Sequence, residues 1–319
     1  MDRIDLKRKV GNIEQLAYVR ETTFSSGKAK GVRALEVNNG LISFTVICDR
    51  GFDISDMRYK NVNLSFISKN GVVNPHLIHT NAVGFTSSFT GGFLYTCGLD
   101  NTGGDKFGKV THGSQTTVPT SIVNIDKYWD GNDYVLQVTG IMENTALFGP
   151  NVIIERTITT SYMSDEVNIR DEIINEAFLE AKYRLLYHFN FGYPLVDEGA
   201  EIVADILSTI PRTPESADNM EDMLKIDAPK DEYPEFVFFH KLRGDYPTVE
   251  LRNEKLGLSA SLAYSAKNLV EFTEWKSMVS GDYAVGLEPA SVNIDSDDFC
   301  TIAPQSSVVN EITFKVKEI

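Results

Sequence analysis

The stretch from Tyr183 to Pro194, YRLLYHFNFGYP, constrains the fold of this 319-residue chain more than any other. Its side chains alternate between two faces with the period of a β-strand, and Gly192, Tyr193 and Pro194 end it with turn residues. One face carries Tyr183, Leu185, Tyr187, Phe189 and Phe191, and the other carries Arg184, Leu186, His188 and Asn190. We therefore expect a rigid strand that packs its aromatic face and presents a titratable group, His188, on the other.

The same alternation recurs along the chain, with turn residues between the alternating runs. Ile122–Lys127 and Tyr134–Val138 flank Trp129–Asn132, which is typical of a β-hairpin. Many strands without strand–helix alternation predict a large all-β antiparallel sandwich. The other expected strands are Leu41–Cys48, Leu64–Ser68, Asn151–Thr160, Glu166–Ile174, Phe236–His240, Thr248–Arg252, Leu256–Tyr264, Leu269–Trp275, Tyr283–Leu287 and Val308–Lys317, with a short apolar strand inside Thr90–Leu99.

Helical patterns are few. We expect a short helix around Asn12–Val19 and a second over Pro211–Lys225, the latter as an excursion from the sheet rather than a domain. The chain has no internal repeat, low-complexity tract or linker. The sequence therefore predicts one domain over residues 1–319, with residues 1–30 as an N-terminal extension that packs on it.

Composition excludes several classes of partner. The net charge of −15 repels phosphate backbones, so we expect no nucleic-acid partner. No apolar run is long enough to span a bilayer, and the N-terminus lacks the apolar core of a signal peptide, so we expect no membrane association. Cys48, Cys97 and Cys300 form neither a disulfide framework nor a zinc pattern, which favours a reducing cytoplasm.

Three residues are candidates for acid–base chemistry. His188 lies on the strand described above, and His112 follows a glycine-rich loop. Glu288 ends an apolar run and precedes Pro289, so desolvation can raise its pKa above the usual value of about 4.3 and make it a stronger base. On local sequence alone, each of the three also fits an ordinary structural role.

Other residues are candidates for binding a hydroxylated ligand. Arg50 lies in the turn Asp49–Asp53, where it fits either an ion-pair cluster or a fork that binds neighbouring hydroxyls. Trp275 and Lys276 combine a flat apolar plate with a cation, which suits the C–H face of a sugar, although a tryptophan there also fits a core position. Asn190 shares the face of His188.

We expect no metal and no cofactor. His76 and His79 have the spacing of two ligands on one helical turn, but Pro75 and the lack of a helical period argue against a helix, and no third ligand stands out. The glycines at 103 and 104 match neither phosphate-binding spacing.

Five motifs, in this order and spacing, resemble the aldose 1-epimerase (galactose mutarotase) superfamily, and most closely a branch known only as aldose 1-epimerase-like. They are DRGFDI at 49–54, GGFLYTCGLDNTG at 91–103, THG at 111–113, YHFNFGYP at 187–194 and GLEPA at 286–290. The resemblance runs from about Asp49 to the C-terminus. It implies a β-supersandwich with a sugar cleft on a concave sheet face.

The resemblance also implies roles for individual residues. His188 would be the general acid at the ring oxygen, and Glu288 the base that takes the proton from the anomeric hydroxyl. His112 would hold and polarise the sugar, and Arg50 would bind hydroxyls. Tyr187 before the acid histidine, and Pro289 and Ala290 after the base, depart from the galactose enzymes. The pattern around Glu288 is closer to mutarotases of modified or phosphorylated sugars, so a free, an acidic and a phosphorylated sugar all stay open.

The expected function is therefore that of an isomerase which interconverts the anomers of a small sugar, in a monomer or a homodimer. One alternative is a carbohydrate-binding or sensing protein that has the cleft without turnover. Another is a different sugar isomerase or epimerase on the same scaffold, such as a ketose–aldose or C2-epimerising enzyme.

Overall fold

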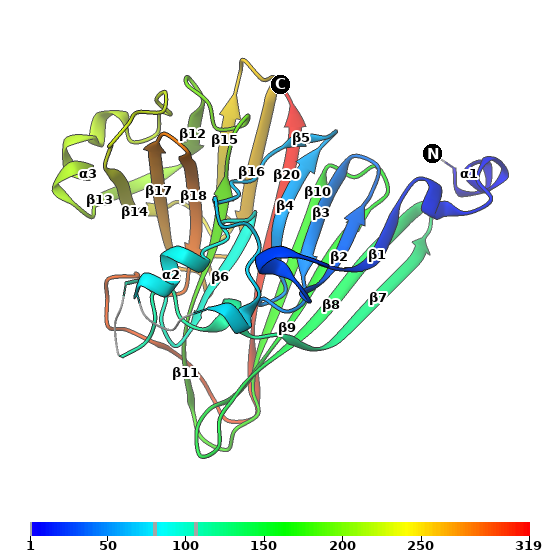
Figure 1. Cartoon of the computed structure of the whole chain (residues 1–319), viewed down its shortest axis with the longest axis horizontal. Helices are drawn as coiled ribbons and strands as arrows, with labels where there is room; N and C mark the ends of the chain where they lie inside the picture. The colour runs from blue at the N-terminus through cyan, green and yellow to red at the C-terminus, as the bar shows by residue number, and fades with distance from the viewer. Residues whose placement is uncertain (1, 79–81, 105–107) are drawn as a thin grey trace.

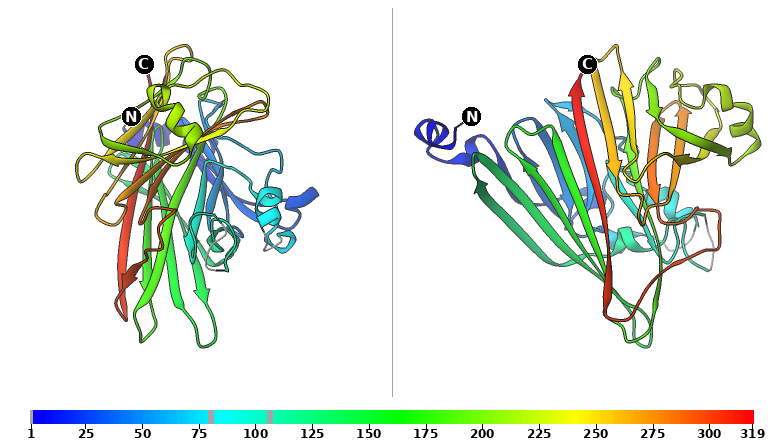
Figure 2. Two further views of the ribbon diagram at one scale, coloured as in Figure 1. Left: turned by 90° about the vertical axis from the view of Figure 1, so that its left-hand side faces the viewer. Right: turned by 180° about the vertical axis from the view of Figure 1, so that it is seen from behind.

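The computed structural model describes residues 2–78, 82–104 and 108–319, and these form two antiparallel β-sheets packed face to face (Figures 1 and 2). The larger sheet has 12 strands and the smaller has 8. In the larger sheet the order is β1 (Tyr18–Thr23), β2 (Arg33–Asn38), β3 (Ile42–Ile47), β4 (Asp53–Tyr59), β6 (Leu94–Leu99), β11 (Ala181–Phe191), β18 (Asp282–Ala290), β17 (Glu271–Val279), β14 (Glu235–Leu242) and β13 (Ile206–Pro211), while β5 (Val62–Asn63) pairs with β4 and β19 (Cys300–Ile302) with β11.

The smaller sheet follows the order β12 (Glu201–Ala204), β15 (Thr248–Asn253), β16 (Leu258–Tyr264), β20 (Ser306–Glu318), β10 (Glu166–Asn175), β9 (Asn151–Ser161), β8 (Asp133–Thr145) and β7 (Thr120–Asp130). The helices are α1 (Arg3–Lys9), α2 (Ala82–Ser88) and α3 (Pro214–Asp218), with 3₁₀ turns at Ile13–Gln15, Gly27–Ala29, Pro75–Leu77, Gln115–Thr117 and Met220–Asp222. None of the helices described is long and apolar enough to cross a bilayer.

The predicted sandwich and most of its strands are confirmed. β11 contains Tyr183–Phe191 of the alternating stretch, and every residue of this strand except Lys182 is buried. Its aromatic face packs between the sheets, where Phe189 and Phe191 meet Phe93, whose ring centroid lies 4.6 Å from that of Phe314 on β20. β11 is therefore an interior strand whose second face is available for a site.

A buried ion-pair network also joins the two sheets. Arg156 on β9 contacts Asp171 on β10 at 2.7 Å and reaches across to Asp53 on β4 at 2.8 Å, with its side chain fully buried. Tyr187 on β11 donates to Asp171 at 2.8 Å. Asp53 therefore pairs across the interface between the sheets and not with Arg50.

The predicted N-terminal helix at Asn12–Val19 is wrong. Only Ile13–Gln15 makes a 3₁₀ turn, and β1 begins at Tyr18 and forms the edge of the larger sheet. The helix lies earlier, over Arg3–Lys9, where the side chain of Asp2 accepts the first free N–H groups.

Two further elements are shorter than predicted. The helix expected over Pro211–Lys225 is limited to α3 and one 3₁₀ turn, because the ammonium group of Lys276 binds the main-chain oxygens of Asp222, Met223 and Lys225 and holds that segment in a turn. Leu64–Ser68 makes two isolated bridges instead of a regular strand.

Candidate active site

His188 and Glu288 meet on neighbouring strands in the middle of the larger sheet. The register that pairs Phe189 with Leu287 on β11 and β18 sets His188 opposite Glu288. The Nε2 atom of His188 lies 3.1 Å from the Oε1 atom of Glu288, and both side chains are almost fully buried. Residues a hundred positions apart in the sequence thus form a direct pair on a rigid scaffold.

Gly286 makes room for this pair. It lies two residues before Glu288 on the same face of β18, and a Cβ atom built there would lie 2.5 Å from Oε1 of Glu288 and 3.0 Å from Cε1 of His188. Any side chain at this position would have to displace one of the two groups. The glycine of the GLEPA motif is therefore required by the contact itself and not by a turn.

Burial sets the protonation of the pair. It raises the pKa of Glu288 well above its usual value and lowers the pKa of His188 well below its usual value, with His112 adding to the second effect. Both shifts favour the uncharged form of the group concerned.

His112 faces the same space from the loop that follows β6. Its ring centroid lies 5.7 Å from that of His188, and its Nδ1 is 2.9 Å from the main-chain oxygen of Thr102. Because a carbonyl oxygen can only accept, Nδ1 carries the hydrogen and Nε2 keeps its lone pair when the ring is neutral. Burial lowers the pKa of His112, which favours that neutral form.

The backbone around His112 is held in an unusual conformation. Its φ is +62°, and Gly113 follows with φ of +75°. A Cβ atom at Gly113 would overlap the main-chain oxygens of Gly98 and Asn101. The THG motif therefore fixes the imidazole through a turn in which the third residue, Gly113, has no room for a side chain.

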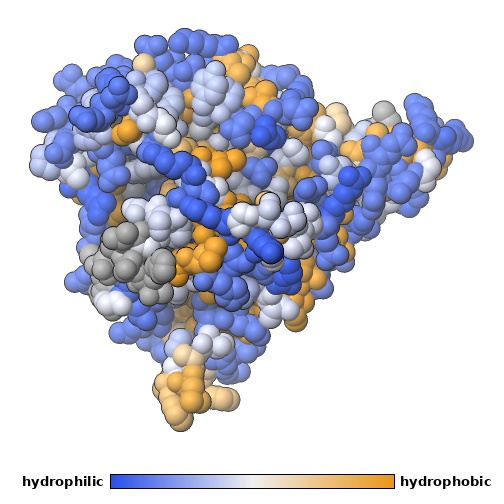
Figure 3. All heavy atoms as spheres, in the orientation of Figure 1, coloured by the Kyte–Doolittle hydropathy of each residue, from blue (hydrophilic) through white to orange (hydrophobic). Residues whose placement is uncertain are grey.

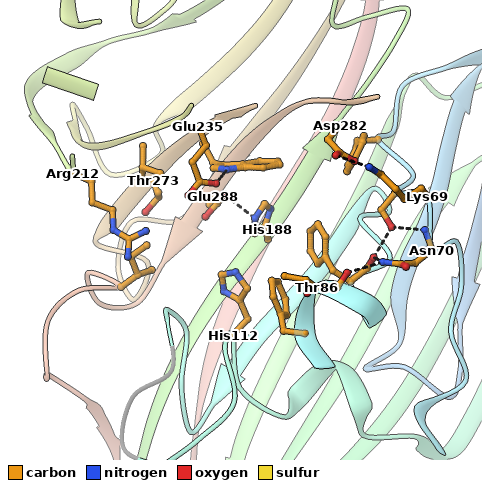
Figure 4. A pocket seen from close by; sticks show the side chains of 17 residues that line it. Lys69, Asn70, Thr86, His112, His188, Arg212, Glu235, Thr273, Asp282 and Glu288 are labelled. Atoms are coloured by element: carbon orange, nitrogen blue, oxygen red, sulfur yellow. Dashed lines mark hydrogen bonds and ion pairs between the residues drawn. The ribbon is translucent and has the colours of Figure 1, made fainter. Parts of the chain in front are cut away.

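A cavity of about 460 Å³ opens over these three groups. Figure 4 shows His112, His188 and Glu288 at its centre, Arg212 at one side, and Lys69 and Asp282 at the other. Four aromatic side chains line it in addition, namely Phe66, Phe85, Phe89 and Trp275. The size and the mix of apolar walls with a few polar groups are typical of a small-molecule site.

Trp275 is fixed against the pair. The ring centroids of Trp275 and His188 are 5.6 Å apart, and the indole N–H donates to the Oε2 atom of Glu235 at 2.9 Å. Trp275 therefore lines the cavity, with its ring orientation held by a carboxylate.

Four charged residues of the cavity were missed by sequence reasoning. Arg212 makes a two-pronged contact with Asp295 at 2.9 and 3.0 Å, and Lys69 lies 2.8 Å from Asp282. Glu235 completes the set. Neither Arg212 nor Lys69 stands out locally, but Glu235 could have been found, because the alternation along β14 puts it on one face with Val237, which also lines the cavity.

Arg50, Lys276 and Asn190 lie outside the cavity lining. The guanidinium of Arg50 is buried and donates to the main-chain oxygens of Val73 and Ser88 at 3.1 and 3.2 Å, so it holds loops together. Lys276 points to the opposite face of β17 from Trp275, as strand alternation requires. Asn190 is buried, and its amide donates to the main-chain oxygen of His188 at 2.9 Å. Their predicted role in sugar binding gains nothing from these positions.

No cluster of three or more His, Cys, Asp or Glu side chains within the described part of the chain is arranged to hold a metal. His76 lies in the 3₁₀ turn Pro75–Leu77, and its proposed companion, His79, is outside the described residues. The site therefore consists of the titratable groups His112, His188 and Glu288 and of the side chains that line the cavity around them.

Comparison with known proteins places the chain in a family. A family model described as a domain of unknown function, DUF4432, matches residues 29–313. The chain belongs to this family. Among proteins with curated descriptions, none matches the sequence. Membership in DUF4432 thus carries no activity with it.

Solved structures share the fold at low sequence identity. A protein of Klebsiella pneumoniae subsp. pneumoniae, provisionally assigned as an aldose 1-epimerase, is 20% identical with a TM-score of 0.89 over 96% of this chain and 86% of that one. A galactose mutarotase-like protein of Clostridium acetobutylicum is 12% identical with a TM-score of 0.69 over 96% and 100%. The galactose 1-epimerase of Lactobacillus acidophilus NCFM is 9% identical with a TM-score of 0.62 over 95% and 99%. This DUF4432 chain therefore has the galactose mutarotase-like fold.

Proposed function

We propose that this protein is a sugar mutarotase, which interconverts the anomers of an aldose or a modified sugar. The observation that carries the proposal is the 3.1 Å contact between His188 and Glu288 in the wall of the aromatic-lined cavity. The fold, shared with a galactose 1-epimerase and with proteins provisionally assigned to the same activity, supports the same class of reaction.

The chemistry needs what this pair provides. Opening a cyclic hemiacetal removes one proton from the anomeric hydroxyl and delivers one to the ring oxygen, and closing on the other face reverses both transfers. In the roles expected from the resemblance, His188 donates to the ring oxygen and Glu288 accepts from the anomeric hydroxyl. These roles need the charged form of each group at the start of the reaction, whereas burial alone favours the uncharged forms.

The other groups of the cavity hold the ring in place. The neutral His112 has a free lone pair for a sugar hydroxyl, and the face of Trp275 offers an apolar plate for C–H groups. The reaction transfers no electrons, and the bonds that change are those at the hemiacetal. The side chains already named are sufficient for such a reaction.

The proposal is tested by anomer exchange. NMR exchange spectroscopy across free, acidic and phosphorylated sugars identifies the best substrate for the wild type. We expect Glu288→Gln and His188→Ala each to lower the catalysed rate by about 10²–10⁴-fold, the usual contribution of a positioned acid or base. If both variants equilibrate that sugar as fast as the wild type does, the proposal fails.

A second buried His–Glu contact serves as the matched control. His240 and Glu274 lie 3.0 Å apart, equally buried, on the face of the sheet away from the cavity. Glu274→Gln should keep the exchange rate while it removes the same kind of contact. Sugar affinity by calorimetry without faster exchange would favour a binding protein, and solvent deuterium entering at C2 would favour a different isomerase.

A further inference from the structure

An exposed hydrophobic tip lies at the end of the molecule where the long strands converge. It consists of Leu147 and Phe148 in the turn between β8 and β9, and Phe178 and Leu179 in the turn between β10 and β11. Figure 3 shows this lower end as a patch of hydrophobic atoms that stands out from a mainly hydrophilic surface. The four side chains are between 79% and 101% exposed, which is unusual for large apolar groups that lie side by side.

The tip is built by hydrogen bonds. Gly149 donates its N–H to the oxygen of Ala146 at 2.9 Å, which closes the first turn. In the second, the side chain of Asn175 donates to the oxygen of Leu179 at 2.9 Å, and the N–H of Glu176 binds the oxygen of Asn151 at 3.0 Å, which ties the two turns together. The apolar side chains are therefore held outward by an ordered framework.

Charge indicates what kind of partner fits. The chain carries a net charge of −15; residues 144–154, which include the first turn and the strand ends beside it, contain no charged side chain, and the second turn carries the exposed Glu176 and Glu180. An anionic lipid surface would repel the acidic body, which argues against membrane insertion. Two copies that touch at their tips keep their acidic bodies as far apart as the shape allows, so the repulsion between them is smallest in that arrangement.

The area agrees with a pair of copies. Aromatic side chains bury about 150–250 Å² each, so the two rings and two leucines expose on the order of 700 Å² on one copy. Two tips packed together bury on the order of 1,400 Å² in total, which is within the range of specific interfaces. From these observations we infer that the tip formed by Leu147, Phe148, Phe178 and Leu179 is a self-association surface that joins two copies of this chain.

Sedimentation equilibrium of the full chain tests the inference. We expect the wild type to dimerise, Phe148→Ser/Phe178→Ser to dissociate at least tenfold more readily, and added salt to strengthen the wild-type dimer by screening the charge. Tyr246→Ser, an exposed aromatic outside the tip, is the control and should dimerise like the wild type.

Disulfide cross-linking tests whether the two copies meet at the tip. Under mild oxidation, Phe148→Cys should form a disulfide-linked dimer, and Tyr246→Cys should not. Two results would overturn the inference. One is a wild type that stays monomeric at a concentration on the order of 10⁻⁴ M. The other is a Phe148→Ser/Phe178→Ser variant that dimerises as tightly as the wild type. Circular dichroism identical to that of the wild type verifies that the variants are folded.

Discussion

The absence of a side chain at position 286 is as important to the site as the groups that are present. A methyl group there would meet Glu288 and His188 directly, while the backbone of Gly286 itself has an ordinary conformation. We predict that Gly286→Ala lowers the rate of anomer exchange by about 10²-fold, because a shift of about 1 Å between reacting groups has that effect.

A second glycine-to-alanine substitution is the control for this prediction. Gly281→Ala, at a position with open space, should leave the rate unchanged, although its positive φ costs some stability. Exchange NMR on both variants, with denaturant unfolding of each, separates an effect on the pair from an effect on the fold. Equal rates in Gly286→Ala and the wild type would contradict the prediction.

The buried carboxyl group of Glu288 also gives stability a pH dependence. Its pKa is raised in the folded state, so above the unfolded value of about 4.3 the unfolded chain releases a proton that the native protein keeps. Native stability therefore falls by about 1.4 kcal/mol per pH unit from that value up to the folded pKa. Glu288→Gln removes this slope.

We predict that Glu288→Gln is more stable than the wild type at pH 8 and gains less, or nothing, at pH 5. Urea unfolding of both proteins at the two pH values measures the difference. A gain of the same size at both pH values would mean that Glu288 is not desolvated in the native protein.

At the scale of residues, the sequence indicated which side chains are candidates for the site better than it indicated which face of a strand each side chain points to. His188 and Glu288 were found because a titratable residue stands in an apolar strand, which is visible in one dimension. Lys276 was assigned to the sugar beside Trp275, although neighbours on a strand point to opposite faces. Arg212 could not be found, because its place in the cavity depends on how the edge of the sheet folds over.

At the scale of elements, the segment between β13 and β14 depends on one cation. The ammonium group of Lys276 is buried and binds the main-chain oxygens of Asp222, Met223 and Lys225. Lys276→Met leaves these oxygens without their donor, and an unsatisfied buried polar group costs about 1–3 kcal/mol. We therefore predict a loss of roughly 2–4 kcal/mol.

Lys225→Met is the control for this prediction. Lys225 forms a solvent-exposed pair with Asp222, so its loss should leave the free energy of unfolding nearly unchanged. Urea unfolding measures both variants, and limited proteolysis locates any opening within the segment. Equal losses in the two variants would show that Lys276 does not hold the segment.

Strands were predictable where alternation was strict, and helices were not. β9 alternates buried and part-exposed residues along its whole length, and the predicted range Asn151–Thr160 differs from the structure by one residue. The helix expected over Pro211–Lys225 is shorter than predicted, since only α3 and one 3₁₀ turn form there and a distant side chain, Lys276, binds the main-chain oxygens of the rest. Asp2, Asp5 and the basic end of α1 contained a helix pattern that was available in the sequence and was not used.

For the molecule as a whole, Arg156 joins the two sheets through Asp53 and Asp171. We predict that Arg156→Met costs about 3–5 kcal/mol, because it leaves two buried carboxylates without the cation that neutralises them. Arg170→Met, which breaks the partly exposed pair with Glu172, should cost no more than about 1 kcal/mol. Thermal and urea unfolding compare the two, and a small loss in Arg156→Met would mean that packing alone holds the sheets together.

The division of the cavity between interior strands and outer segments has a consequence for how such proteins diversify. His188 and Glu288 sit on β11 and β18, whose neighbours on both sides hold them in register, whereas Lys69, Phe85 and Arg212 come from segments beyond the centre of the sheet. Insertions and substitutions in those outer segments can reshape the cavity without moving His188 or Glu288. Under the proposed function, relatives that differ only in these segments would accept different sugars and carry out the same reaction on them.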